Sequence, residues 1–182
     1  MELFFPPGLT VSFSLSCLFR PIHQAGYPSD GSHSYFRILL ETFFISDSRS
    51  QKYAIDVVKV NEGGWFFQNN GEDLTDIYSF GEPVYAPVAG VVTIVVDSLP
   101  NHEVSFFPSD SLNPAGNHVV IHFDKERYLF MAHLMAGTIE VQKGDSVKAG
   151  DIVGKIGNSG NSSWPHLHLH IQDKPAIGIA KT

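Results

Sequence analysis

The chain has 182 residues, the length of one ordinary domain with room for a short extra segment. Hydrophobic residues make up 43% of it and charged residues 17%, so a core can form and a disordered chain is excluded. The formal net charge of −7 argues against nucleic acid as a partner and against a basic membrane-binding patch, because both require an excess of Lys and Arg.

Cysteine and hydropathy limit the chain further. Cys17 is the only cysteine, so no intrachain disulfide and no cysteine-rich metal site can form, and a metal would need His, Asp or Glu. No run of about 18 apolar residues is present, so we predict no membrane span. The apolar N-terminus carries Glu2 and the pair Pro6-Pro7, and it therefore lacks the features of a clear signal peptide.

The elements that we expect are mostly short strands. Residues 1–32 show no clear period, and residues 34–45 fit a strand or a short helix equally well. Residues 61–82 and 98–116 are predicted to be long polar loops, which in a compact domain are often functional. The predicted strands are 53–60, two within 83–96 around a turn at Pro87 and Gly90, the hairpin 118–123 and 128–134, short strands within 146–157, and 166–172. This pattern predicts a mainly antiparallel β fold.

Three histidines alternate with leucines in the last predicted strand. Side chains in a strand point to opposite faces in turn, so His166, His168 and His170 share one face and the leucines share the other. The spacing favours histidines with different tasks, one binding a metal and one facing a substrate beside it. The alternative is a solvated face that is rich in histidine, and His170 is the member most easily explained as structural.

Asp56 and His133 are the other candidate site residues. Asp56 lies among apolar neighbours, where a carboxylate is costly unless it is paired or bound to a cation, so a salt bridge and a metal explain it equally well. His133 ends the predicted strand 128–134, where its side chain can emerge into a cleft, although its local context alone favours a structural role. The histidines best explained as structural are His23, His102, His118 and His122.

Four segments carry a resemblance to a known family. They are YAIDV (53–57), GEPVYAPVAGVV (81–92), MAHL (131–134) and VQKGDSVKAGDIVGKIGNSGNSSWPHLHLHI (141–171). In this order they resemble the lysostaphin/LytM-type (duplicated hybrid motif) zinc metalloendopeptidases, over about residues 51–173. The resemblance implies a compact β sandwich or open-barrel-like peptidase domain with long loops forming a cleft, for which 61–82 and 98–116 are the expected walls. Residues 1–50 match poorly and 174–182 form a short tail.

The resemblance also implies roles for individual residues. Asp56 and His168 would bind Zn²⁺, and His133 and His166 would be the catalytic histidines beside a metal-activated water. The usual spacing of the family's first histidine ligand leads to Lys52, and lysine is a poor zinc ligand at neutral pH. His33, in a Ser-His context further upstream, is the predicted replacement, and His23 is the other candidate.

These residues predict a zinc endopeptidase that hydrolyses peptide bonds in bacterial peptidoglycan stems or cross-bridges. The family's substrate implies a secreted or cell-envelope location. The main alternative is a degenerate, non-catalytic member that acts as a cell-wall-binding or activator module, which Lys52 would favour. A third possibility is a carrier-type β domain, because biotinyl, lipoyl and phosphocarrier domains share a similar glycine pattern, but none of them needs P-H-L-H in the next strand. The sequence does not determine the oligomeric state.

Overall fold

The chain is almost entirely β structure in the part that the structure describes. In this computed structural model, residues 54–105, 107 and 110–175 are described in full, and strands at 2–4, 10–12 and 34–39 by their backbone. Within these ranges the one helical element is the short 3₁₀ helix η3 (Leu74–Asp76), and no helix there has the length and apolarity that a membrane crossing requires. The predicted mainly antiparallel β fold is confirmed.

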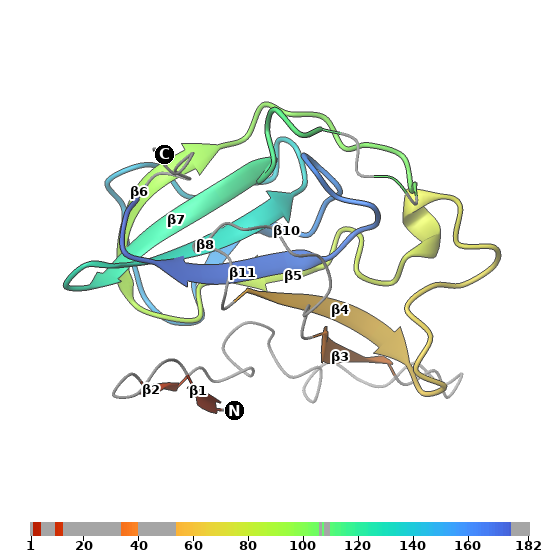
Figure 1. Ribbon diagram of the computed structural model, residues 1–182, viewed down its shortest axis with the longest axis horizontal. Coiled ribbons are helices and arrows are strands. Elements are labelled where there is room, and N and C mark those ends of the chain that lie inside the picture. Colours follow the sequence, from red (N-terminus) through yellow and green to blue (C-terminus); the bar gives the residue numbers. More distant parts are fainter. Residues whose placement is uncertain are drawn as a thin grey trace.

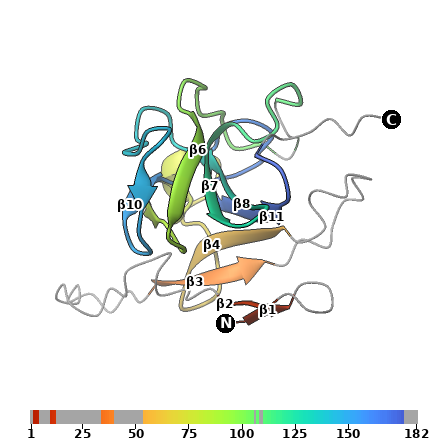
Figure 2. The same cartoon turned by 90° about the vertical axis from the view of Figure 1, so that its left-hand side faces the viewer.

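Seven strands form one open sheet. Its order is β3-β4-β11-β8-β7-β6-β9, every neighbouring pair is antiparallel, and β3 and β9 are the two edges, so this sheet is not a closed barrel (Figure 1). The sheet is strongly twisted: β3 and β4 at one end run in a markedly different direction from β6 and β7 at the other end (Figure 2). The strands are β3 (Ser34–Leu39), β4 (Ile55–Asn61), β6 (Gly90–Val96), β7 (Asn117–Asp124), β8 (Arg127–Leu134), β9 (Ser146–Val147) and β11 (Leu167–Gln172).

Two smaller sheets accompany it. β5 (Pro83–Tyr85) pairs with β10 (Ile152–Lys155), and β1 (Glu2–Phe4) pairs with β2 (Thr10–Ser12), both antiparallel. The predicted hairpin is present as β7 and β8, joined through Lys125 and Glu126, and the ambiguous segment 34–45 contains strand β3. The loops at 61–82 and 98–116 are present where the structure describes them, the first containing η3.

One face of the central strands builds the core. Leu167 and Leu169 of β11 pair across the sheet with Val57 and Ile55 of β4, and Leu169 pairs with Met131 of β8. All five side chains are buried in a single apolar cluster. Burying each such side chain contributes about 1.5–3 kcal/mol, so the apolar face of β11 holds the strand in its register.

The same register aligns a polar row on the opposite face. His168 of β11 lies between Asp56 of β4 and Ala132 of β8, directly paired with both. Because side chains at paired positions point to the same side of a sheet, Asp56 and His168 meet although they are 112 residues apart in the sequence.

Candidate metal centre

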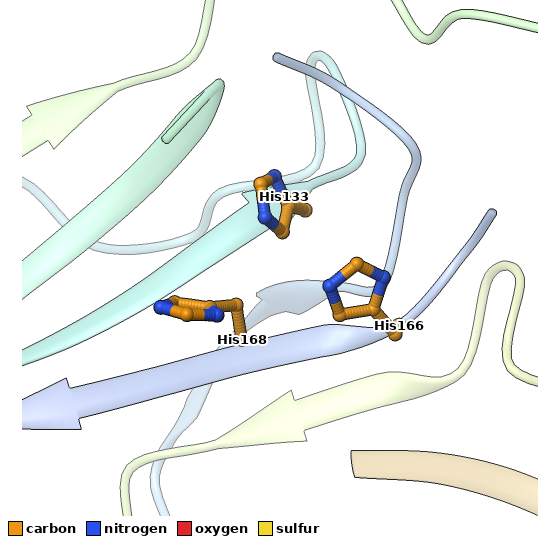
Figure 3. A group of neighbouring side chains, drawn as sticks. All are labelled: His133, His166 and His168. Carbon is orange, nitrogen blue, oxygen red and sulfur yellow. The ribbon is translucent and has the colours of Figure 1, made fainter. Parts of the chain in front are cut away.

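Four titratable side chains gather where β4, β8 and β11 run together. Asp56 lies in β4, His133 near the end of β8, His166 just before β11, and His168 inside β11. Each is less than one tenth exposed, at 6%, 6%, 8% and 9%. The three imidazole rings turn toward one another (Figure 3), and one nitrogen from each lies within 4.8 Å of the others.

Asp56 bridges two of these histidines. Its Oδ1 accepts a hydrogen bond from Nδ1 of His168 at 2.8 Å, and its Oδ2 lies 3.5 Å from Nε2 of His166. The ring centroids of His133 lie 4.8 Å from His166 and 5.7 Å from His168. Polar groups that are this deeply buried are costly to maintain unless they serve one another or a ligand, so the cluster is a strong candidate for a functional site.

His133 is held by an unusual backbone conformation. Its φ is +62°, in the left-handed region that residues other than glycine rarely adopt. Its amide donates to the Ala115 carbonyl at 3.0 Å, its own carbonyl accepts from the Gly157 amide at 3.0 Å, and its Nδ1 hydrogen-bonds the Ser159 carbonyl at 2.9 Å. Backbone strain of this kind persists only where the surroundings enforce it, and these three contacts do so.

Two glycines allow the chain segments that hold His133 to meet. A Cβ built on Gly160 would lie 2.2 Å from the Gly116 nitrogen, and one built on Gly116 would lie 2.4 Å from the Ser159 carbonyl carbon. No side chain fits at such distances, and both residues also have positive φ. The glycines therefore permit the close approach that delivers the Ser159 carbonyl to His133.

The two long loops lie against the segment that leads to His166. The Ser105 amide donates to the Ser163 carbonyl at 2.9 Å, which attaches the 98–116 loop. From the 61–82 loop, the Phe66 ring packs on Trp164 with centroids 5.7 Å apart. The Trp164 carbonyl in turn accepts from Nδ1 of His166 at 2.7 Å. Both loops therefore contact the segment that positions His166.

The hydrogen bonds assign the ring tautomers. His133 and His166 each direct Nδ1 at a backbone carbonyl, which can only accept, so Nδ1 carries a proton and Nε2 is the nitrogen left for the cluster. His168 directs Nδ1 at a carboxylate instead. The cluster thus presents Nε2 of His133 and Nε2 of His166 beside an Asp–His pair.

Burial and charge shift the pKa values within the cluster. Burial raises the pKa of Asp56, but the charge of His166 and the hydrogen bond from His168 outweigh it and lower the pKa to about 2. Burial, followed by the charges of His166 and His168, holds the pKa of His133 well below its ordinary value. At neutral pH Asp56 is a carboxylate and His133 is a neutral imidazole, the forms in which both groups can bind a metal.

The donor set fits a zinc ion in chemistry and in spacing. Imidazole nitrogen and carboxylate oxygen are ordinary zinc ligands, and two ligands in tetrahedral geometry lie about 3.3 Å apart. Asp56 lies 2.8 Å from His168 through Oδ1 and 3.5 Å from His166 through Oδ2, so a donor oxygen is within reach of an ion beside either ring. Asp56 and the three histidines are therefore residues that could hold the ion.

Comparison with known proteins shows the family of this chain. The family described as Peptidase family M23 matches residues 68–177, which is 110 of the 182 residues. The chain belongs to peptidase family M23. The resemblance predicted from the four sequence segments is thus confirmed. Of the M23 chain's four clustered residues, His133, His166 and His168 lie inside the matched range and Asp56 lies before it.

Several solved structures resemble this M23 chain. The catalytic domain of lysostaphin from Staphylococcus simulans shares 23% identity over 69% of each chain, with a TM-score of 0.43. A zinc containing peptidase from Vibrio cholerae shares 20% over 68% of this chain and 48% of that one, with a TM-score of 0.40. A peptidase M23 from Pseudomonas aeruginosa shares 26% over 50% and 34%, with a TM-score of 0.38. The chain thus spans about a third of the Pseudomonas protein and about half of the Vibrio protein.

The structure brings together four of the five site residues that the sequence predicted. Asp56, His133, His166 and His168 form the cluster, whereas His33 lies outside the described residues, as do His23 and Lys52. Sequence analysis assigned no role to the polar residues that support the cluster. Ser159 and Asn117 are examples: Ser159 Oγ accepts from the Asn117 amide at 2.9 Å and donates to the Leu134 carbonyl at 2.8 Å. Ser159 lies in one of the four segments that carry the resemblance and Asn117 lies just before the predicted strand 118–123, but neither position reveals such contacts.

Proposed function

We propose that this M23 chain is a zinc-dependent endopeptidase that hydrolyses peptide bonds in bacterial peptidoglycan stems or cross-bridges. The observation that carries the proposal is the buried cluster of Asp56, His133, His166 and His168 in a member of this family. The proposed peptidase domain is 51–173, with 1–50 as a segment that contributes a ligand and 174–182 as a short tail. The protein would be secreted or located in the cell envelope, where peptidoglycan lies.

Asp56 and His168 are the proposed metal ligands of this site. Their pairing at 2.8 Å puts a carboxylate and an imidazole side by side on adjacent strands, which supports this assignment. When bound, zinc supplies Lewis-acid chemistry, polarising the peptide carbonyl and lowering the pKa of a water molecule to about 7. Asp56 would also neutralise part of the ion's charge in a buried place, where an unpaired cation is costly.

His133 and His166 are the proposed catalytic histidines. Each directs Nδ1 at a carbonyl oxygen, so Nε2 is the nitrogen left to exchange a proton with water or substrate. One would act as general base toward the attacking water, and the other would stabilise the oxyanion or protonate the leaving amine. The strained backbone of His133 and the carbonyl of Trp164 behind His166 support a role that needs fixed orientation.

His33 is the proposed third protein ligand, and a set made of three histidines is the alternative to it. Ser34, the next residue, pairs with Asn61, five residues along β4 from Asp56, or about 17 Å at the usual rise of a strand. A set made of His133, His166 and His168, whose nitrogens lie within 4.8 Å of one another, needs no residue outside the described part. The two sets make different predictions for single variants.

The decisive experiment measures zinc content and peptidoglycan hydrolysis on the same purified protein. The variants are His33→Ala, His133→Ala and His168→Ala, each with a chelator-treated control. The proposal expects about one zinc per chain in the wild type, lost in His33→Ala and His168→Ala but kept in His133→Ala, which no longer cuts. Zinc lost in His133→Ala and kept in His33→Ala would support the all-histidine set instead.

The remaining outcomes bear on the alternative, a non-catalytic family member that binds the cell wall. Lys52 at the position of the usual first ligand is the observation in its favour. Wild-type protein that sediments with peptidoglycan but releases no new amino groups would support it. Wild-type protein without zinc after loading would overturn the zinc endopeptidase.

A further inference from the structure

A chain of hydrogen bonds continues from Asp56 along β11 beyond the proposed ligands. Nδ1 of His168 contacts Asp56 Oδ1 at 2.8 Å, and Nε2 of the same ring contacts Nδ1 of His170 at 3.1 Å. Nε2 of His170 then contacts Oε1 of Gln172 at 3.3 Å, and the Gln172 amide donates to the Lys174 carbonyl at 2.7 Å. The chain therefore joins alternate positions of one strand to the carboxylate on its neighbour.

The Gln172 end of this chain fixes the direction of the bonds as far as His168. Gln172 uses its NH₂ group for a backbone carbonyl, so Oε1 faces His170 and must accept from Nε2–H. Nδ1 of a neutral His170 is then an acceptor, and it receives the Nε2–H of His168. Asp56 faces Nδ1 of His168 on the other side, and this is the nitrogen on which a metal would take the place of a proton. His170 thus accepts from the nitrogen of His168 that points away from Asp56.

Packing holds the His170 ring in the orientation that this bond needs. His170 is 4% exposed and pairs with Phe130 of β8 in the sheet register. Their rings stack with centroids 4.5 Å apart and an interplanar angle of 12°, and Phe130 is fully buried. Stacking on Phe130 fixes the plane of the His170 ring, and its two hydrogen bonds fix which nitrogen faces His168, so its Nδ1 is a preorganised acceptor.

We propose that His170 is a positioning residue for the metal centre: by accepting the Nε2–H of His168, it directs Nδ1 of that ring toward Asp56 and the ion. The inference rests on the proposed zinc site. Ligand histidines generally donate their second ring N–H to a fixed acceptor, and loss of that acceptor typically lowers metal affinity about 10–100-fold. Here the acceptor is a third histidine on the same face of the same strand.

Two variants of His170 separate hydrogen bonding from packing. His170→Phe keeps a flat ring for stacking on Phe130 but removes the acceptor, whereas His170→Asn keeps an acceptor oxygen near the place of Nδ1 but removes the ring. Zinc affinity of the full chain is measured by competition with a chromophoric chelator. We expect His170→Phe to bind zinc about 10–100-fold more weakly and His170→Asn to stay within about threefold of wild type.

The reverse order, with weak binding in His170→Asn and normal binding in His170→Phe, would overturn the proposal because packing would then be the role of the residue. Nitrogen-15 NMR of the wild-type protein gives a test that needs no variant. It should find His170 protonated on Nε2, and protonation on Nδ1 instead would overturn the proposal. If zinc binds equally to wild type and His170→Phe, only this inference fails. If the wild type binds no zinc, the proposed function fails, and the inference fails with it.

Discussion

The two faces of β11 differ in what keeps them buried. On one face, Leu167 and Leu169 join an apolar cluster with residues of β4 and β8, where burial itself supplies the free energy. On the other face, His168 and His170 are also buried, and a chain of hydrogen bonds that begins at Asp56 satisfies their polar atoms. The same strand thus separates a face that stabilises the fold from a face that a fold alone would not require.

This difference between the two faces predicts how each responds to substitution. Buried polar groups gain less from burial than apolar groups of the same size, and each depends on all its partners being present. On the histidine face of β11, a single substitution should therefore lower the free energy of unfolding more than a substitution of both partners together. The leucine face should respond to each change in proportion to the volume removed.

Asp56→Leu should show the largest effect on stability. The substitution leaves His168 and His166 buried without their carboxylate partner, and removal of one partner of such a pair typically costs about 3–5 kcal/mol. Urea unfolding of the chelator-treated protein measures the change. A loss below about 1 kcal/mol would mean that the histidine face does not depend on the pair.

Leu167→Ala tests the apolar face. Leu167 is fully buried in the core cluster, so the free energy of unfolding should fall by about 3 kcal/mol, within the usual 2–5 kcal/mol for this truncation. Zinc affinity of the folded fraction should stay close to that of the wild type, because the side chain points away from the cluster. A variant that is stable but has lost zinc would contradict the separation of the two faces.

The double variant Asp56→Leu with His168→Leu sharpens the comparison. Replacing both members of a buried pair with apolar residues is often neutral, so the double variant should lie within about 1–2 kcal/mol of the wild type and be more stable than Asp56→Leu alone. Zinc should no longer bind. A double variant that is as unstable as Asp56→Leu, or that loses the sum of the stability losses of the two single variants, would show that the pair serves the fold rather than the site.

The smallest effect should come from His118 at the outer part of the histidine face. Burial lowers the pKa of His118, and Nδ1 donates to the Gly116 carbonyl at 2.7 Å. Below the unfolded pKa of 6.5, the unfolded chain binds a proton that the folded chain does not, so stability falls as pH decreases from 6.5 toward the folded pKa. In His118→Asn, unfolding in urea with chelator should depend less on pH across this window. An unchanged pH dependence would contradict the assignment.

Local patterns were enough to predict most of the fold and part of the site. The period of two in 166–172 predicted the separation of histidines from leucines, which the core contacts of Leu167 and Leu169 confirm. The hairpin predicted from strands 118–123 and 128–134 is present as β7 and β8. The role of His170 was not predicted, because its partners Phe130 and Gln172 follow from sheet register and from stacking.

The sequence by itself determined most strands after residue 50, their apolar faces and the family, because alternation and turn residues act over a few neighbouring positions. Only the tertiary structure decided that Asp56 meets His168 across 112 residues, and that His133 is held at positive φ by Ala115, Gly157 and Ser159. Those contacts depend on which strands pair and on how closely two glycine-bearing segments approach. Register and close approach are set by the packing of the whole sheet, so no short segment specifies them.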